Sequence, residues 1–390
     1  MILVLQTDTF GARGGIPTYN RIVCQALAQS DQRLAGTDVR VLIANDTPAD
    51  VASSGNGLTN PSLEGFGGNR FALVRRACGL AFRSPLDLVL FGHVNYAPLG
   101  LVLKRLRPKL RYGVIAYGIE AWDRLSFTKR LALGRADFVV SISKFTKERL
   151  SQINEIEASA IKLVPPSLDL DPRDSSELGA RLAAPTLQAE AKGVKLLSVC
   201  RLEQGERYKG IDTVIEALPA VLTQVPQLQY FVVGSGSDLN RHKSLAREKG
   251  VAAHVNFVGS IDSDALQEHY RSCDLFVMPS AREGFGIVYL EAMRARKPVI
   301  AANSGAAPEV VKDHKTGLLV EYGNTKHLAD AITSLCLDSN LRKRLGEAGY
   351  NRWQQNFTFD HFKKNLYEVI LSELPASVLN RCQQEIRLAS

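Results

Sequence analysis

The sequence lacks the features that mark a membrane-spanning or secreted protein. No apolar run reaches the roughly 18 residues that a bilayer-spanning helix requires. Residues 1–5 are apolar and are followed by Gln6, with no basic segment before them and no small-residue cleavage site after them, which is typical of a first strand and not of a signal peptide. We therefore expect a cytoplasmic protein.

Disulfide, metal and common nucleotide motifs are also missing. The six cysteines follow no C-x-x-C or metal-ligand spacing, and most lie in apolar runs, so we expect buried thiols in a reducing compartment: Cys24, Cys78, Cys200, Cys273, Cys336 and Cys382. Neither G-x-G-x-x-G nor G-x-x-x-x-G-K-[ST] occurs. These absences exclude a classical dinucleotide site and a Walker phosphate loop.

Positive charge is abundant but confined to one half of the chain. The net charge of +8 arises within residues 1–165, which hold 21 basic and 13 acidic residues, whereas residues 166–390 hold 27 of each. Residues 70–111 alone carry nine Lys or Arg against one acid, Asp87. Interleaved aromatic residues and recognised nucleic-acid modules are absent, so we expect no nucleic-acid partner. The charge favours another anionic partner.

Length and strand pattern predict two α/β domains. At 390 residues the chain exceeds what one hydrophobic core usually holds. Apolar runs alternate with helix-length amphipathic stretches, at 2–6, 39–44, 86–92, 112–117 and 138–143, and again at 194–200, 230–234, 255–258, 275–279, 299–302 and 318–320. This alternation is typical of doubly wound parallel sheets, whose ligands bind beyond the carboxyl ends of the strands.

The domain boundaries follow from composition. We place an N-terminal domain at 1–168, a polar linker at 169–192, a C-terminal domain at 193–356, and a final helix and tail at 357–390 that cross back to the N-terminal domain. Residues 52–69, rich in Gly, Ser and Asn, are expected to form a long loop.

Two strand-to-helix loops carry residue types that suit a phosphate group. Gly14 and Gly15 follow the first strand, where glycine lets the backbone approach a ligand, although a tight turn alone would use the same pair. Arg201 directly follows the strand at 194–200, and Lys209 comes eight residues after Arg201. A guanidinium and an ammonium in one loop suit a diphosphate, with solvated surface charges as the alternative.

A third loop combines glycines with two carboxylates. Glu283 and Glu291 enclose a turn after which a helix begins, and the N–H groups from Phe285 to Ile287 would favour an anion. The two carboxylates are eight residues apart, so they cannot form an i,i+4 pair. A carboxylate accepts two hydrogen bonds from a diol, which suits sugar hydroxyls, although Glu291 alone could be an ordinary surface residue.

The stretch 283–293, E-G-F-G-I-V-Y-L-E-A-M, resembles the E-x7-E signature of retaining glycosyltransferases of family 4, which have the GT-B fold of two Rossmann-like domains facing a central cleft. Arg201 and Lys209 match the donor-diphosphate pair of that family, although relatives usually have fewer residues between them, so we expect this loop to bulge. The segments 232–236, 257–261 and 303–310 resemble further motifs in the same order. The resemblance implies a set of donor-binding residues: Gly14, Gly15, Arg201, Lys209, Gly234, Val258, Ile261, Glu283, Gly284, Phe285, Gly286, Ile287 and Glu291.

In the N-terminal domain the resemblance is weaker. Many relatives place a histidine near the acceptor, and numerous members carry it where this chain has Tyr117. His93, directly after the strand at 86–92, is the nearest histidine by pattern and could orient a hydroxyl, or serve as a hydrogen-bonded structural residue. We expect Glu120 and Trp122 to make polar and stacking contacts with an acceptor sugar.

The resemblance implies transfer of a hexosyl unit from a nucleotide sugar to a hydroxyl of a saccharide or lipid-linked saccharide, with retention at the anomeric carbon. UDP-glucose is the first expectation for the donor and GDP-mannose the second, with Glu283, His93, Arg201 and Lys209 as catalytic residues. We expect no cofactor and no metal, because the cations and the helix N-terminus can stabilise the departing diphosphate, and the D-x-D at 169–171 lies in the linker.

Two other functions remain open: a non-catalytic GT-B scaffold subunit of a glycan-assembly complex, and a nucleotide-sugar epimerase. The basic residues at 70–111 fall in the acceptor half and predict peripheral contact with an anionic membrane at its inner face. A solvated helix face is the alternative. Each basic residue near an anionic leaflet contributes roughly 1 kcal/mol.

Overall fold

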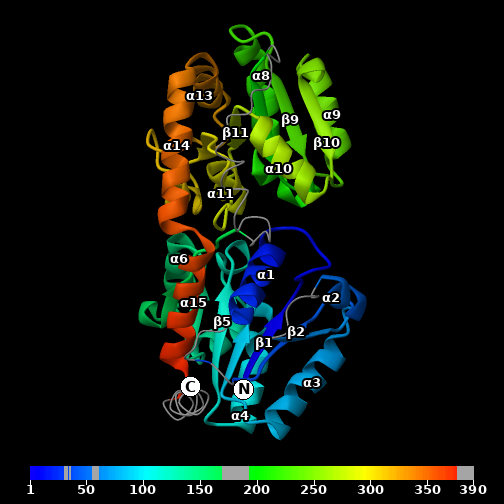
Figure 1. The fold of residues 1–390 in the computed structure, drawn as a ribbon, viewed down its shortest axis with the longest axis vertical. Coiled ribbons are helices and arrows are strands. Elements are labelled where there is room, and N and C mark those ends of the chain that lie inside the picture. Colours follow the sequence, from blue (N-terminus) through cyan, green and yellow to red (C-terminus); the bar gives the residue numbers. More distant parts are fainter. Residues whose placement is uncertain (30–33, 35–36, 55–60, 169–192, 376–390) are drawn as a thin grey trace. The chain divides into compact units, whose positions relative to one another are not determined.

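The computed structural model describes residues 1–29, 34, 37–54, 61–168 and 193–375. The chain divides into two compact units: unit 1 comprises Met1–Leu170 and Phe359–Ser390, and unit 2 comprises Asp171–Thr358. Each contains a sheet flanked by helices (Figure 1). The linker predicted at 169–192, the end of the predicted tail and Cys382 lie outside the described residues.

The sheet of unit 1 has seven parallel strands in the order β3-β2-β1-β4-β5-β6-β7. The strands are β1 (Ile2–Gln6), β2 (Val39–Ile43), β3 (Ser62–Gly65), β4 (Leu88–Phe91), β5 (Arg111–Ala116), β6 (Phe138–Ser141) and β7 (Ile161–Leu163). The helices are α1 (Gly15–Ala28), α2 (Pro48–Ser54), α3 (Arg70–Arg83), α4 (Ala97–Leu106), α5 (Phe127–Gly134), α6 (Lys144–Asn154) and α15 (Phe359–Glu373). Every residue of the central strands β1 and β4 is buried, because helices cover both faces.

The sheet of unit 2 has six parallel strands in the order β10-β9-β8-β11-β12-β13. They are β8 (Lys195–Val199), β9 (Gln229–Val233), β10 (Val255–Gly259), β11 (Leu275–Met278), β12 (Val299–Ala302) and β13 (Gly317–Val320). The helices are α8 (Ile211–Leu222), α9 (Leu239–Glu248), α10 (Ser263–Ser272), α11 (Ile287–Arg294), α12 (Ala307–Val310), α13 (Thr325–Leu337) and α14 (Ser339–Asn356).

Both sheets have the doubly wound order that the sequence predicts, so that prediction is confirmed. The strand order reverses between β1 and β4 in unit 1 and between β8 and β11 in unit 2. Ligands of such sheets bind beyond the strand ends at this reversal. A ligand of unit 2 is therefore expected at the loops after β8 and β11.

Two edge strands differ from the sequence prediction. The prediction of a loop throughout 52–69 is wrong, because α2 extends to Ser54 and β3 pairs in parallel with β2. The three-residue strand β7 was also not predicted. Both strands are short, and no residue of β3 is fully buried. These strands form by pairing with an existing sheet edge, and no apolar pattern in the sequence predicts them.

The last described helix, α15, packs against α1. The Tyr367 hydroxyl donates to the carbonyl oxygen of Ala26 at 2.9 Å, and the ring of Phe362 meets that of Tyr19 edge to face at 5.3 Å. Helix α15 thus belongs to unit 1 and packs on a helix that flanks its sheet.

The cysteines within the described residues are free thiols: Cys24, Cys78, Cys200, Cys273 and Cys336. Burial raises the pKa of the Cys24, Cys200 and Cys273 thiols to about 12. They remain protonated at neutral pH and act as small apolar side chains.

Candidate functional site

The loops after β8 and β11 lie against each other in unit 2. The backbone N–H of Ala281 donates to the carbonyl oxygen of Tyr208 at 2.8 Å. Gly210 has a φ of +80°, and a Cβ there would lie 2.4 Å from the carbonyl oxygen of Pro279. Glycine is therefore required where the two loops meet. This contact brings the loop that carries Lys209 next to the loop that carries Glu283.

Lys209 and Glu283 form an ion pair between these loops. Lys209 Nζ lies 3.0 Å from Glu283 Oε2, and both side chains are mostly buried. Burial lowers the pKa of the Lys209 ammonium, but the Glu283 carboxylate and the Tyr208 hydroxyl outweigh it and leave the pKa above its ordinary value. Lys209 is therefore a fixed positive charge in a largely buried place.

Arg201 has a carboxylate partner that the sequence analysis missed. Its guanidinium, on a side chain that is 63% exposed, pairs with Glu206, whose side chain is 15% exposed. The second carboxylate oxygen of Glu206 is buried and has no hydrogen-bond partner among the described residues. Glu206 lies in the lengthened loop, so its position between Arg201 and Lys209 was the available signal. Any diphosphate bound here must compete with Glu206 and Glu283 for the two cations.

Helix α11 begins beside this charged cluster. Its N-cap, Gly286, has a φ of +94°, and a Cβ there would lie 2.2 Å from the Tyr289 ring. The first N–H groups of the helix, at Ile287 and Val288, have no acceptor within the helix and can bind an anion. Phe285 is buried and packs on Phe357, so its side chain belongs to the core and its backbone alone can contribute to a site.

The glycine turn after β9 also approaches the β8 loop closely. Gly234 has a φ of +137°, and a Cβ there would lie 1.9 Å from the carbonyl oxygen of Cys200. The hydroxyls of Ser235 and Ser260 are 2.6 Å apart and join this turn to the loop after β10. Val258 and Ile261 flank that junction and are half-buried. The predicted nucleobase segment is thus adjacent to the predicted G-x-G turn.

Glu291 lies in the second turn of α11, eight residues after Glu283. It accepts a hydrogen bond of 2.6 Å from the hydroxyl of Tyr270, whose ring is fully buried. The sequence analysis missed Tyr270, and nothing in its local pattern distinguishes it from a core tyrosine. This bond holds the Glu291 carboxylate in one orientation. Glu291 is therefore not the ordinary solvated surface residue that the sequence left as an alternative.

In unit 1 the glycine loop is held by an acidic residue that the sequence analysis also missed. Gly14, with a φ of +137°, is the N-cap of α1, and Gly15 is its exposed first residue. The buried carboxylate of Asp46 accepts hydrogen bonds from the backbone N–H groups of Thr9, at 3.2 Å, and Phe10, at 2.6 Å. Asp46 therefore fixes the path of the chain into this loop.

His93 and Tyr117 lie near each other in unit 1, with ring centroids 6.2 Å apart. His93 Nδ1 accepts a hydrogen bond from the backbone N–H of Asn95 at 3.1 Å, which leaves the proton on Nε2. Burial, with Lys129 adding to it, lowers the pKa of His93 to about 4. At neutral pH His93 can donate a hydrogen bond but carries no positive charge.

The other predicted acceptor residues are tied into unit 1. The buried Tyr117 hydroxyl donates to Asn20 Oδ1 at 2.6 Å, and the Glu120 carboxylate accepts from the backbone N–H of Tyr117 at 2.6 Å. Burial raises the pKa of Glu120, although its bonds from backbone N–H groups oppose that shift. Trp122 is 3% exposed and donates to Thr146 Oγ1 at 3.0 Å. A ring so buried offers no face for the stacking on a sugar that we expected of Trp122.

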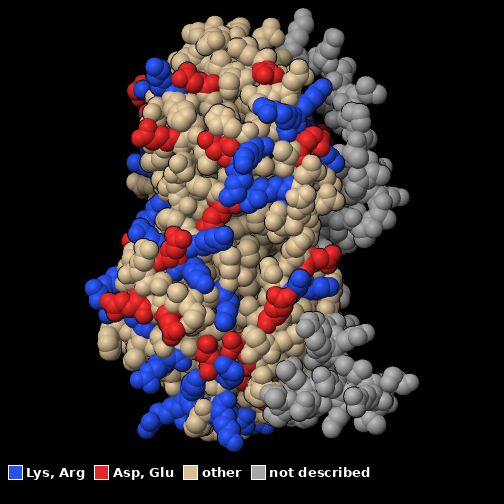
Figure 2. Space-filling view, turned by 90° about the vertical axis from the view of Figure 1, so that its left-hand side faces the viewer, with Lys and Arg blue, Asp and Glu red and all other residues tan. Residues whose placement is uncertain are grey.

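The predicted basic stretch forms a mixed basic and apolar surface. Lys and Arg gather at the lower end of unit 1 in Figure 2, the end at which α3 and α4 lie in Figure 1. Phe71 and Phe82 of α3 are 80% and 65% exposed, and Val102 of α4 is 50% exposed. Several basic residues of this stretch have no ion pair among the described residues: Arg70, Arg75, Arg83, Arg105 and Lys109. We call Phe71, Val74, Phe82, Val102, Leu106 and these five the α3–α4 face.

The described residues contain neither a cluster of metal ligands nor a membrane-spanning helix. These residues contain no group of three or more His, Cys, Asp or Glu arranged to hold a metal ion. A D-x-D sequence at 262–264 that the sequence analysis overlooked starts α10, where Asp262 caps the helix by accepting from the Ala265 N–H at 2.8 Å. None of the described helices is both long and apolar enough to cross a membrane.

Comparison with known proteins gives consistent likenesses. A family model described as "Glycosyl transferases group 1" matches residues 186–352. The GDP-mannose-dependent alpha-(1-6)-phosphatidylinositol monomannoside mannosyltransferase of Mycobacterium tuberculosis is 35% identical over 278 residues, covering 68% of this chain and 70% of that protein. The protein of the same name from Mycolicibacterium smegmatis is 33% identical over 287 residues, covering 69% and 73%. HepE from Anabaena in complex with UDP has a TM-score of 0.74 at 22% identity, covering 95% of this chain and 99% of that one.

Proposed function

Since this chain belongs to the glycosyl transferases group 1, which transfer a sugar from a nucleotide-sugar donor, we propose that its donor is GDP-mannose and its acceptor an inositol-containing glycolipid. Both mycobacterial relatives are named for that donor and for a phosphatidylinositol monomannoside. UDP-glucose, the donor expected first from the sequence, is the alternative to test, because the fold is also similar to a UDP-bound structure.

The observation that carries this proposal is the charged cluster at the switch point of unit 2. Arg201, Lys209 and the N–H groups of α11 converge there from the loops after β8 and β11. Departure of a nucleoside diphosphate places negative charge on the phosphate oxygens, and preorganised cations stabilise it as it develops. The sugar bond breaks as the acceptor hydroxyl attacks, and the leaving phosphate takes the hydroxyl proton, so retention requires no protein nucleophile.

The two glutamates bind hydroxyl groups in this proposal. Once Lys209 engages the diphosphate, the Glu283 carboxylate is released to accept hydrogen bonds from the donor sugar, and Glu291, held by Tyr270, binds the ribose. In unit 1, His93 orients the acceptor hydroxyl as a neutral donor. If Glu283→Ala left turnover intact at saturating donor, the role of Glu283 would be disproved.

The donor is identified by a direct transfer assay. The purified protein is incubated with vesicles containing phosphatidylinositol monomannoside and with radiolabelled GDP-mannose or UDP-glucose, and label in the lipid is measured. Label from GDP-mannose alone is the expected result. Lys209→Ala should lower transfer at least about 100-fold through the lost phosphate contact, whereas Arg247→Ala, on the exposed side of α9, should not. Label from UDP-glucose alone would overturn the donor assignment.

Two further properties follow from the same site. Transfer should persist in EDTA, because the protein's own cations bind the diphosphate, and nuclear magnetic resonance of the product should show the α-configuration of the donor. Release of free sugar or an epimerised nucleotide sugar without transfer would favour the epimerase alternative. Binding of the nucleotide without any turnover would favour the non-catalytic scaffold.

We further propose that the α3–α4 face docks on an anionic membrane that holds the acceptor. Arginines beside exposed phenylalanines fit this partner, because the charges attract anionic headgroups while the rings enter the interfacial region. The association is peripheral, through the surface of unit 1.

A further inference from the structure

The loop between Arg201 and Lys209 contains a segment without a core of its own. Residues Gln204–Lys209 form two short 3₁₀ turns separated by a kink at Glu206, and none of these residues is buried. Turns of this type are weak on their own, because their hydrogen bonds are poorly aligned. Something outside the segment must therefore keep Lys209 in one position.

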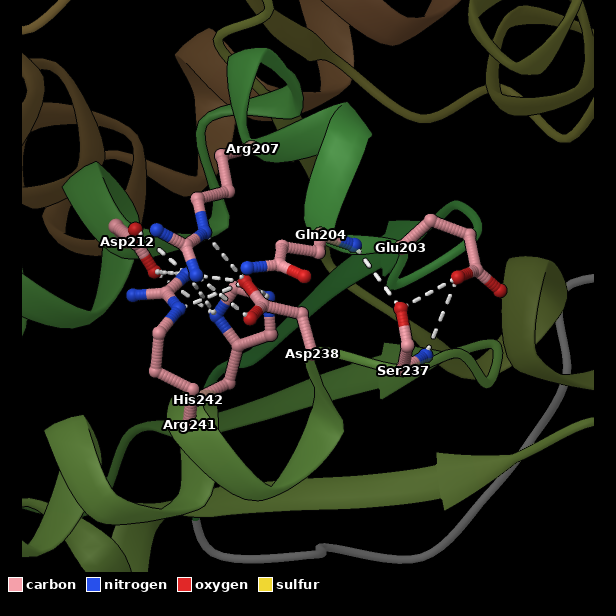
Figure 3. A network of polar contacts seen from close by, with 8 residues as sticks. All are labelled: Glu203, Gln204, Arg207, Asp212, Ser237, Asp238, Arg241 and His242. Carbon is pink, nitrogen blue, oxygen red and sulfur yellow. Dashed lines mark hydrogen bonds and ion pairs between the residues drawn. The ribbon is translucent and has the colours of Figure 1, made fainter.

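A network of ion pairs holds the segment from one side (Figure 3). The Arg207 guanidinium donates two hydrogen bonds to the Asp238 carboxylate, at 2.9 and 3.0 Å. Arg241 Nε donates to the same carboxylate at 2.7 Å. Asp238 is 4% exposed, and the bonds from Arg241 and Arg207 hold its pKa well below the ordinary range. Such a buried charge is tolerated because both arginines pair with it.

The network continues into the helix that follows the lengthened loop. The second end of the Arg241 guanidinium lies 2.9 Å from the Asp212 carboxylate in α8, and His242 Nδ1 lies 2.8 Å from Asp212 Oδ1. Arg207 is thereby connected through Asp238 to both α8 and the start of α9. We call Arg207, Asp238, Arg241, Asp212 and His242 the Arg207 clamp.

Backbone and side-chain hydrogen bonds reinforce the same junction. The N–H of Leu202 donates to the carbonyl oxygen of Ser235 at 2.9 Å, and the N–H of Asp238 donates to that of Leu202 at 2.8 Å. The Ser237 hydroxyl donates to Glu203 at 2.6 Å (Figure 3). On the opposite side, Tyr208 and Gly210 contact the loop after β11. The segment is held between two neighbouring strand-end turns.

We propose that Arg207 and Asp238 are positioning residues that fix Lys209, two residues beyond Arg207, for the diphosphate of the donor. This inference rests on the proposed function, in which Lys209 contacts that diphosphate. The extra residues of the loop would leave Lys209 mobile if they were unrestrained. A charged side chain that must first be ordered binds its ligand more weakly, because part of the binding free energy is lost in ordering it. The clamp removes this ordering cost before the donor arrives.

The test measures nucleoside diphosphate binding by calorimetry, with GDP and UDP as probes. Arg207→Ala and Asp238→Asn should each raise the dissociation constant of the preferred nucleotide about tenfold. Arg207→Lys, which keeps the charge but cannot form the two-pronged bond, should restore part of the affinity. Arg247→Ala removes a positive charge from exposed α9 outside the clamp and should leave the affinity unchanged.

A double-mutant cycle separates positioning from other effects. If Arg207 acts through Lys209, adding Arg207→Ala to Lys209→Ala should change the dissociation constant less than about twofold. An equal loss in both backgrounds, or no loss in the wild-type background, would overturn the positioning role. Thermal melts of every variant distinguish unfolding from lost positioning. If the wild-type protein bound neither GDP nor UDP, the proposed donor site itself would be overturned, and the clamp's role with it.

Discussion

Lys209 keeps its charge in a place that burial makes unfavourable, because Glu283 lies 3.0 Å away. Arg201 is paired in the same way with Glu206, so both cations of the proposed donor site carry a carboxylate before any ligand arrives. The two carboxylates differ in their other roles. In the proposed mechanism, Glu283 binds sugar hydroxyls once the diphosphate has displaced it from Lys209. Glu206 has no such second partner, so it only competes with the diphosphate for Arg201.

Removing the charge of Glu206 should therefore tighten donor binding. We expect Glu206→Gln to lower the dissociation constant of GDP about three- to tenfold, since the phosphate no longer competes for Arg201. Calorimetric titration of GDP measures this change. Glu216→Gln, which removes an equal charge from the exposed face of α8, is the matched control. Weaker binding by Glu206→Gln would show that this carboxylate supports the site.

His93 should make stability depend on pH. Its pKa of about 4 in the folded protein lies below the ordinary 6.5, so between these values the unfolded chain binds a proton that the folded chain does not. The free energy of unfolding should fall by up to about 3 kcal/mol as the pH drops through this window. His93→Asn, whose amide oxygen can accept the Asn95 N–H, should remove this dependence. Melting temperatures of both proteins from pH 7.5 to 4.5 test it, and parallel curves would contradict it.

At the scale of elements, the buried parallel strands were predictable from sequence, whereas the two edge strands of unit 1, β3 and β7, were not. Strand β12, four apolar residues at 299–302, was predicted to the residue because burial on both faces leaves a continuous apolar run. Strand β3, with the sequence S-L-E-G, has no such run and exists through pairing with β2.

The candidate site shows the same division. Arg201 and Lys209 lie in the loop after β8, and Glu283 and Glu291 have a recognisable spacing after β11. The two loops do meet in the structure. Tyr270, which pairs with Glu291, and Asp238, which pairs with Arg207, could not be identified, because a pairing across 21 or 31 residues leaves no local pattern. Glu206 lies only five residues from Arg201, so its place in the loop was a signal that the sequence did offer. The expectation that Trp122 stacks on an acceptor sugar has a related weakness. The sequence around Trp122 does not reveal that its ring is buried and that Thr146 accepts the hydrogen bond from the indole N–H.

The membrane docking proposed for the α3–α4 face can be tested by substituting only exposed side chains, which leaves the core of unit 1 intact. Replacing Phe71 and Phe82 together with Ser should reduce vesicle binding at least about tenfold, since each ring contributes about 1.5–3 kcal/mol when removed from water. Flotation with phosphatidylcholine vesicles, with and without phosphatidylinositol, measures the binding. Leu337→Ser, at an equally exposed apolar residue of α13, is the control. Retained binding by the double variant would exclude the α3–α4 face.

At the scale of the whole molecule, unit 1 is assembled from two stretches of chain that are far apart in sequence. Helix α15 meets α1 through Phe362 and Tyr367, and Glu373 forms an ion pair of 2.6 Å with Arg111 at the start of β5. Unit 2 lies between these stretches in the chain. The stability of unit 1 therefore depends on residues that follow unit 2.

Phe362→Ala tests this dependence. The ring is 1% exposed, and its loss should cost unit 1 about 3–5 kcal/mol through the lost burial and the cavity. Scanning calorimetry should show a lowered transition that GDP does not shift, while the transition stabilised by GDP stays in place. Phe127→Ala, at an exposed ring, should change neither transition. A single transition lowered as a whole would show that the two units unfold together.

The same connectivity has a consequence during translation. At about 5–20 residues per second, the ribosome takes roughly 10–40 s to synthesise Asp171–Thr358 after Leu170 has been added. Throughout that interval the nascent unit 1 presents the apolar surface of α1, including Tyr19, that α15 later covers. Unit 2 can fold as soon as its own last helix emerges, so the later half of the chain matures first. The newborn chain therefore offers chaperones a binding surface on unit 1 whose lifetime is set by the length of unit 2.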